Sequence, residues 1–136
     1  GAVLSPFDSY QLIRGLKTLS LRMERSTANA QEIVAFLEQS PEVKEVLYTG
    51  RGGMISFKVA DEKRIPHILN TLKVFSFAES LGGVESLITY PTTQTHADIP
   101  AEVRHSYGLT DDLLRLSIGI EDARDLIEDL RQALEG

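Results

Sequence analysis

The sequence predicts an α+β domain in which helices pack on one face of a mostly antiparallel sheet. Three observations indicate this class: apolar residues at helical spacing through about the first 40 residues, short apolar runs bounded by turn residues after them, and an amphipathic C-terminal segment. A chain of 136 residues with 42% hydrophobic residues can bury one core. We therefore expect a single domain over residues 1–136.

The N-terminal third is predicted to be helical. Ser5 as N-cap, Pro6 in the first turn and Asp8 at the third position favour a helix start. Apolar residues then recur at helical spacing: Leu12, Ile13, Leu16 and Leu19. Gly15 is expected to divide this stretch into a short helix and a longer one, and the longer one should end before Pro41, because proline cannot continue it.

The central part of the chain is predicted to hold a hairpin and a helix. Apolar runs at 43–48 and 54–59 flank a glycine-rich turn at 50–53, which is typical of two paired strands. Residues 61–72 return to helical spacing, with Pro66 tolerable only in the first turn of that helix.

Further strands are expected at 74–77, 86–90 and 113–118, each a short apolar run between turn residues. A polar loop at 91–100 and one or two helical turns at 100–107 separate the last two. Strands of this number, interleaved with helices, support the α+β class.

The chain is predicted to end in an amphipathic helix over 122–134. Its inward residues are Leu126, Ile127, Leu130 and Leu134. Five acidic residues gather near its start, where negative charge favours the helix dipole: Glu121, Asp122, Asp125, Glu128 and Asp129. We interpret them as a solvated helix face.

Composition argues against several classes of protein. The net charge is -6 and the 14 Lys and Arg are dispersed, which argues against a nucleic-acid surface. The absence of cysteine excludes disulfides and thiolate chemistry. No apolar run approaches the roughly 20 residues that span a bilayer, and the start lacks an export signal. We expect a cytoplasmic protein with no membrane partner.

The common catalytic patterns do not occur. His67, His96 and His105 lack metal-ligand spacing, so no metal site is expected and each is interpreted as a surface or loop residue. The glycines of the 50–53 turn lack the lysine of a phosphate-binding loop. All five lysines are interpreted as solvated: Lys17, Lys44, Lys58, Lys63 and Lys73.

A glycine segment at 78–87 interrupts two strand-like runs with polar residues. Gly82 and Gly83 allow a backbone to approach a ligand closely, and Ser80 offers a hydroxyl and an amide. The alternative is a simple turn between strands.

The predicted strand at 113–118 places an arginine opposite its apolar face. Strand alternation puts Leu114 and Leu116 on one side and Arg115 and Ser117 on the other. A guanidinium held by a strand suits a carboxylate, which it can bind with two parallel hydrogen bonds. The alternative is an exposed arginine or a structural ion pair.

Seven stretches resemble, in the same order, the C-terminal domain of the transsulfuration enzymes of cysteine and methionine metabolism. This family includes cystathionine beta-lyase, cystathionine gamma-synthase, cystathionine gamma-lyase and methionine gamma-lyase. The stretches are 5–9, 14–19, 22–23, 53–57, 78–87, 95–96 and 114–122.

The resemblance implies a fold-type I enzyme that depends on pyridoxal 5'-phosphate. Arg115 would bind the substrate α-carboxylate, and Ser80 would line the same site. Glu79 falls where some members tune substrate choice, and Thr95 is expected to buttress the Ser80 segment.

The Schiff-base lysine and the other cofactor-binding residues of the family would lie upstream of this chain. We therefore expect no catalytic and no cofactor-binding residue here, and an isolated chain that neither binds pyridoxal phosphate nor turns over substrate. The expected partners are its own N-terminal cofactor-binding domain, a small amino-acid substrate and, in the full-length protein, the other subunits of a homotetramer.

Within the family we favour cystathionine beta-lyase, which converts cystathionine to homocysteine, pyruvate and ammonia, with gamma-synthase or gamma-lyase as alternatives. One departure is the turn at 49–51, which is shorter than the loop that most members carry. We interpret it as a shortened surface excursion.

Two other classes of function stay open. One is a free-standing regulatory module that binds a small ligand. Start and stop codons immediately around this segment in the gene would favour that module, whereas an upstream reading frame that encodes a lysine-bearing domain would favour the enzyme. The other is a pure assembly module, in which the helix over 17–39 packs on a partner. Binding of a hydrophobic dye to the fragment, or its self-association, would support this class.

Overall fold

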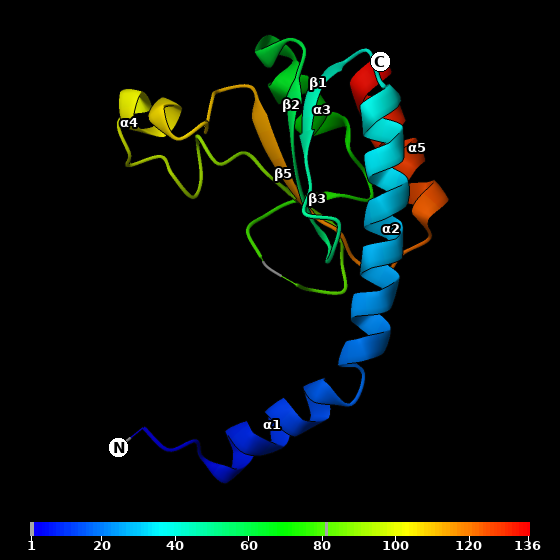
Figure 1. Ribbon diagram of the computed structural model, residues 1–136, viewed down its shortest axis with the longest axis vertical. Coiled ribbons are helices and arrows are strands. Elements are labelled where there is room, and N and C mark those ends of the chain that lie inside the picture. The colour runs from blue at the N-terminus through cyan, green and yellow to red at the C-terminus, as the bar shows by residue number, and fades with distance from the viewer. Residues whose placement is uncertain (1, 81) are drawn as a thin grey trace.

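The computed structural model describes residues 2–80 and 82–136 (Figure 1). Gly1 and Leu81 lie outside the described residues, and Leu81 belongs to the glycine segment singled out above. The elements in chain order are α1 (Pro6–Leu16), α2 (Leu19–Gln39), β1 (Val43–Leu47), β2 (Met54–Val59), η1 (Glu62–Arg64), α3 (Ile65–Thr71), β3 (Ser76–Phe77), β4 (Leu87–Thr89), α4 (Ala101–Ser106), β5 (Leu113–Ser117) and α5 (Ala123–Glu135).

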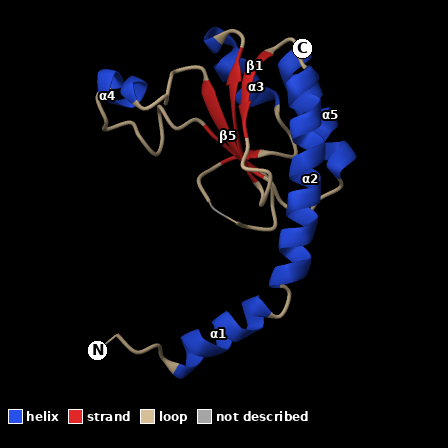
Figure 2. Ribbon diagram, viewed as in Figure 1, coloured by secondary structure: helices blue, strands red, loops and turns tan. Residues whose placement is uncertain are grey.

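The five strands form one sheet in the order β1-β2-β5-β4-β3 (Figure 2). Every neighbouring pair is antiparallel except β3 and β4, which run parallel. The predicted hairpin and the mostly antiparallel sheet are therefore confirmed. Helices α2, α3 and α5 pack on one face as predicted, whereas the short α4 lies on the other side of the sheet (Figure 1).

Strand alternation fills the core from the two central strands. Ile55 and Phe57 of β2 and Leu114 and Leu116 of β5 are fully buried. They meet apolar residues of the two long packed helices: Ile33 and Leu37 of α2, and Leu126, Leu130 and Leu134 of α5. Each such buried apolar side chain stabilises the fold by about 1.5–3 kcal/mol. The intervening residues of β5, including Arg115, face away from these helices.

The break between the first two helices lies at residues 17–18, not at Gly15 as predicted. Gly15 lies within α1, and the turn that follows it is held by hydrogen bonds from the Arg22 side chain. Arg22 donates from Nη2 to the Gly15 carbonyl (2.9 Å) and from Nε to Thr18 Oγ1 (3.2 Å). The start at Ser5 is confirmed, since its hydroxyl accepts from the Asp8 amide (3.1 Å).

Strand β3 is shorter than the predicted 74–77, and a buried carboxylate is the reason. Asp129 is 3% exposed and accepts from the amides of Lys73 (2.8 Å), Val74 (2.8 Å) and Phe75 (3.0 Å). Amides that donate to a side chain cannot also extend the sheet ladder. The interpretation of Asp129 as part of a solvated helix face is therefore wrong.

The segment predicted as one helix at 61–72 is divided. A 3-10 turn, η1, precedes α3, and Pro66 lies in the first turn of α3 as expected. The terminal helix α5 begins after Asp122, whose carboxylate accepts from the Arg124 amide (2.9 Å). No helix in residues 2–80 and 82–136 is both long and apolar enough to cross a membrane.

Helix α1 extends away from the body of the molecule (Figure 1). None of its 11 residues is buried. Its large apolar side chains stand in solvent, as Leu12 (55% exposed) and Leu16 (64%) illustrate. An amphipathic helix in a globular protein normally packs its apolar face against another element. This face of α1 is uncovered within the described residues.

Candidate functional site

Arg115 lies on the sheet face opposite α2 and α5, in a row across three strands. Its register partners are Ser56 on β2 and Thr89 on β4. Arg115 is half-buried, and its guanidinium makes no hydrogen bond or ion pair with any other described residue, although its backbone is paired in the sheet. The two alternatives for Arg115, a fully exposed side chain and a structural ion pair, therefore do not apply within the described residues. Its donors can therefore serve a ligand carboxylate.

The glycine segment begins beside the Arg115 row. Thr89, the neighbour of Arg115 in that row, donates from Oγ1 to the carbonyl of Ala78 (3.1 Å), and the Ala78 amide donates to Ile88 (3.2 Å). Glu79 and Ser80 follow directly, and both are exposed. The sheet thus brings the start of the Ser80 segment to the strand next to Arg115. The shared role of these residues in one site stays a prediction.

The far end of the same segment is tied to the end of β5. Ile120 donates its amide to the Val84 carbonyl (2.9 Å), and Ser86 is held by the side chain of Glu121. Gly82 has a φ of 77°, a left-handed conformation that favours glycine. Residues 78–80 and 82–86 thus belong to a loop whose two ends are both anchored beside the central sheet, and not to a simple turn between strands.

Thr95 lies in the turn between β4 and α4 and is exposed. Its hydroxyl is 2.7 Å from Nδ1 of its neighbour His96. Among the described residues it has no hydrogen bond to the Ser80 segment. Its expected buttressing role stays a prediction. His67 and His105 are exposed, as interpreted, and His96 is partly exposed in this turn.

A small cavity of about 160 Å³ lies where α2, the hairpin turn and the glycine loop meet the end of β5. Its walls include Met23 and Ser26 of α2 and Ser117, which is two residues after Arg115. Neither Ser26 nor Asn29 of the same helix is predicted from the sequence to have a role at the site. The available signal was Asn29 itself, a polar residue in the buried stripe that continues with Ile33 and Leu37.

Lysine is the residue that would anchor a pyridoxal cofactor, and the lysines here do not fit that task. Four of the five are exposed, as interpreted. Lys58 is the exception, because it is half-buried and pairs with Glu45 (2.7 Å). The hydrogen bond to Glu45 raises the pKa of Lys58, whereas a Schiff-base lysine needs a lowered pKa. The described residues therefore fit a substrate carboxylate better than they fit the cofactor.

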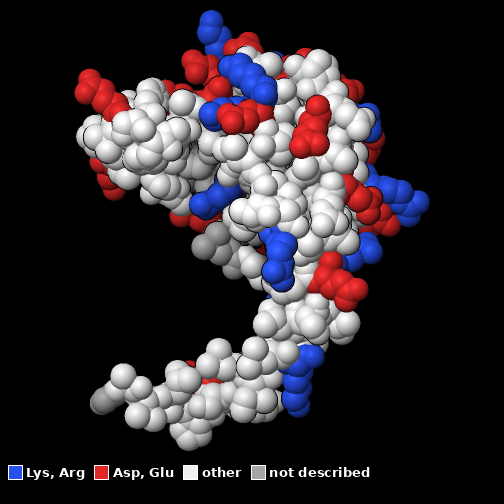
Figure 3. Space-filling model, viewed as in Figure 1, with Lys and Arg blue, Asp and Glu red and all other residues white. Residues whose placement is uncertain are grey.

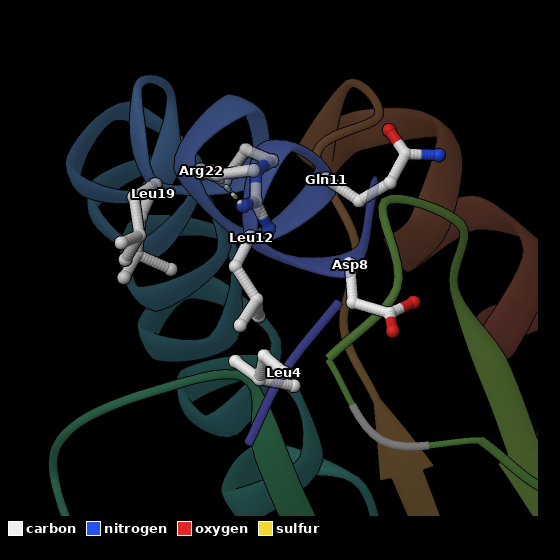
Figure 4. Close-up of a pocket in the computed structure, with 8 residues that line it drawn as sticks. Leu4, Asp8, Gln11, Leu12, Leu19 and Arg22 are labelled. Carbon is white, nitrogen blue, oxygen red and sulfur yellow. Dashed lines mark hydrogen bonds between the residues drawn. The ribbon is translucent and has the colours of Figure 1, made fainter. Parts of the chain in front are cut away.

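A second hollow, of about 580 Å³, lies at the elbow between α1 and α2 (Figure 4). Figure 4 shows Leu4, Leu12 and Leu19 in this groove, with Asp8 and Gln11 also at its edge. Most of its walls are apolar, and they belong to the same uncovered arm. A surface of this kind is typical of a contact with another protein segment.

Comparison with known proteins identifies relatives over nearly the whole chain. The model of the Cys/Met metabolism PLP-dependent enzyme family matches residues 1–135. A cystathionine gamma-synthase/O-acetylhomoserine (thiol)-lyase of Bacillus subtilis is 60% identical over 98% of this chain and 36% of its own length. A cystathionine beta-lyase of Lactococcus lactis is 48% identical over 99% of this chain and 40% of its own length. The chain thus spans well under half the length of these relatives.

Solved structures agree in fold. An O-acetylhomoserine (thiol)-lyase from Campylobacter jejuni, which contains a pyridoxyl-lysine phosphate, is 33% identical with a TM-score of 0.92, and the match covers 100% of this chain and 37% of that one. A cystathionine gamma-lyase from Lactobacillus plantarum, complexed with L-serine, is 35% identical with a TM-score of 0.87, over 98% of this chain and 39% of that one.

Proposed function

Because the chain belongs to the Cys/Met metabolism PLP-dependent enzyme family, we propose that it is the substrate-carboxylate-binding domain of a carbon–sulfur enzyme of cysteine and methionine metabolism. The observation that carries this proposal is Arg115, which is half-buried in the middle of a central strand and whose guanidinium has no hydrogen-bond or ion-pair partner among the described residues. The resemblance assigns the same residue to the substrate α-carboxylate.

Arg115 would act by orienting the amino acid. Two parallel hydrogen bonds from a guanidinium fix both the position and the rotation of a carboxylate. The strand on either side of Arg115 is paired with β2 and β4, so its backbone is held rigidly. A clamped carboxylate places the substrate amine and side chain in a defined geometry, which lowers the entropic part of the barrier. Ser80 is proposed to line the same site, and Glu79 to bear on substrate choice.

The longer protein is proposed to supply the cofactor site. The chain spans 36–40% of the first relatives, and its lysines do not fit the Schiff-base task. We propose that a cofactor-binding domain of the same polypeptide covers the apolar face of α1. Figure 3 shows little charge on the visible face of this arm, in contrast to the body. The full-length protein is proposed to be a homotetramer with its cofactor bound.

The more specific part of the proposal is the reaction that the full-length protein catalyses. Beta-elimination of cystathionine is the reaction predicted from the sequence, and beta-lyases are among the relatives. Alignment length favours gamma-synthase instead: the two gamma-synthase relatives align over 134 and 133 positions, whereas the beta-lyase aligns over 151 positions against 136 residues here. That relative has at least 15 positions this chain lacks. We propose that they belong to the shortened 49–51 turn, and that the reaction is gamma-replacement.

Assay of the full-length protein distinguishes these reactions. Gamma-replacement would join an activated homoserine ester to cysteine, yielding cystathionine and releasing the activating group as its free acid. Beta-elimination from cystathionine would yield pyruvate, and gamma-elimination would yield 2-oxobutyrate. Pyruvate formed faster than cystathionine would return the assignment to beta-lyase. Absence of all three activities would contradict the proposed function.

The isolated 136-residue chain provides a second test. We expect that mixing it with pyridoxal phosphate gives no stoichiometric yellow complex, because the half-buried Lys58 is paired with Glu45 and the other four lysines are exposed on the surface. A complex of one cofactor per chain would contradict the division of labour between the two domains.

A further inference from the structure

The loop that carries Ser80 is not stabilised by regular hydrogen bonds of a helix or a strand. Between β3 and β4 the described residues 78–80 and 82–86 contain no helix or strand, and Gly82 has a positive φ. Exposed residues such as Glu79 and Ser80 do not anchor such a loop by packing. Its position relative to Arg115 must therefore be set by contacts at its ends.

Glu121 makes the principal side-chain contact at the far end. Its Oε1 accepts from the Ser86 amide (2.6 Å) and its Oε2 accepts from the Ser86 hydroxyl (2.9 Å). The Ser86 oxygen in turn accepts from the Gly119 amide (2.9 Å). Ser86 is 1% exposed, so these bonds are shielded from water. Hydrogen bonds to a carboxylate in such surroundings are among the strong ones.

The backbone around Gly119 has no room for a side chain. A β-carbon there would collide with the carbonyl oxygen of Val84 and with the carboxylate of Glu121. Gly119 does not have a positive φ. Glycine is therefore required at this position because the two backbone segments approach each other closely, and not because of an unusual backbone conformation. The end of β5 and the loop are thus in direct backbone contact.

Helix α2 holds the same junction from the other side. Asn29 is 1% exposed and donates from Nδ2 to the carbonyls of Gly119 (3.2 Å) and Glu121 (2.9 Å). Arg25 donates from Nη2 to the Glu121 carbonyl (3.1 Å). The backbone of Glu121 is therefore fixed by α2 while its side chain fixes Ser86. Glu121 follows Arg115 by six residues, so the loop is registered against the strand that carries Arg115.

From these contacts we infer that Glu121 is a positioning residue of the carboxylate site: it holds the far end of the loop at Ser86, and thereby keeps the loop that carries Ser80 in register with Arg115. This inference rests on the proposed function. The role differs from that of a general fold-stabilising carboxylate, because the group it holds is a binding loop and not a core element. Asp129, which holds residues 73–75 in a similar way, provides a contrast away from the site.

The test compares Glu121→Ala, Glu121→Gln and Ser86→Ala in the full-length protein with its cofactor. Glu128→Gln is the matched control, because Glu128 is an exposed acid on α5 whose one ion pair among the described residues is with Arg131 (3.4 Å). Circular dichroism and thermal unfolding first establish that each variant folds. Two readouts follow: hydrogen exchange of peptides that cover 78–90, and KM and kcat for the amino-acid substrate.

We expect Glu121→Ala to speed exchange of the Ser86 region roughly 10- to 100-fold, the factor associated with a lost charge-assisted hydrogen bond. KM should rise about tenfold with a smaller change in kcat, as expected when ground-state binding is impaired. Glu121→Gln should be milder, since it keeps an acceptor for the Ser86 amide. Ser86→Ala should resemble Glu121→Gln, and the control should change neither readout.

Unchanged exchange in Glu121→Ala would overturn the inference, and so would faster exchange with an unchanged KM. Failure of the proposed function is recognised separately. If the wild-type protein binds no amino-acid substrate, the proposed function fails before any variant is compared, and the positioning role fails with it.

Discussion

Helices α1 and α5 show that one sequence pattern can have two outcomes. Both are amphipathic and of similar length, 11 and 13 residues. In α5 the leucines of the apolar face, such as Leu130, are at most 1% exposed. In α1 the corresponding leucines, such as Leu12, are more than half exposed. Periodicity predicts which face of a helix will be covered, but it does not specify what covers it.

Core truncation in α5 should give the largest effect that separates the two helices. Leu130→Ala removes a side chain with no exposed surface and leaves a cavity, so we expect a loss of about 2–5 kcal/mol in the free energy of unfolding. Leu12→Ala in α1 should change it by no more than about 0.5 kcal/mol. Urea unfolding of the 136-residue chain measures both. Equal losses would mean that α1 is packed in solution.

Removal of the buried carboxylate of α5 should give the second-largest loss of stability. Asp129→Asn leaves only one oxygen for the three amides of residues 73–75, and we expect a loss of about 1–3 kcal/mol. Glu128→Gln, one residue earlier and exposed, is the control and should be neutral. Thermal unfolding of the two variants side by side measures the difference. A neutral Asp129→Asn would show that α5 is held by its leucines alone.

A change at the N-cap of α1 should have a local effect. Ser5→Ala removes the acceptor for the Asp8 amide, which costs a helix about 0.5–2 kcal/mol. Since α1 does not pack on the body, this loss should appear as faster hydrogen exchange in residues 6–16 and not as a lower unfolding midpoint. A lower midpoint would contradict the separation of the arm from the body.

Lowering the pH should give the smallest effect, a local loss of protection at the start of α5. Hydrogen bonds and charge from Arg124 lower the pKa of Asp122 from 3.8 to about 2. A carboxyl group whose pKa is lowered in the folded state stabilises that state above its unfolded pKa, and the contribution is lost as the pH falls through the folded value. Protection of the Arg124 amide should therefore persist at pH 4 and disappear towards about pH 2. NMR-detected exchange follows it, and loss already above pH 4 would contradict the capped geometry.

The fold was largely predictable because its elements are local. Helix and strand periodicity located all the longer elements, and Pro41 and Pro66 marked boundaries correctly. Long-range polar contacts were not predictable. Asp129 and Glu121 looked like members of an acidic helix start, but each accepts hydrogen bonds from backbone more than 30 residues away. A pattern along one helix carries no information about such partners.

The candidate site was predictable in part for the same reason. Strand alternation placed Arg115 opposite the core, as the structure has it. The connection from Asn29 through Glu121 to Ser86 joins three distant segments and had no counterpart in local spacing. The resemblance to the family named Ser80, Glu79 and Thr95, and their roles still depend on experiment.

Arg115 is tested most directly by measuring carboxylate discrimination in the full-length protein. Binding of an amino-acid substrate and of its amide, which lacks the α-carboxylate, is compared in the wild type and in Arg115→Gln. We expect the wild type to prefer the acid and the variant to lose about 2–5 kcal/mol of that preference, which is roughly 30-fold or more in relative affinity. An unchanged preference in Arg115→Gln would show that the carboxylate is bound elsewhere.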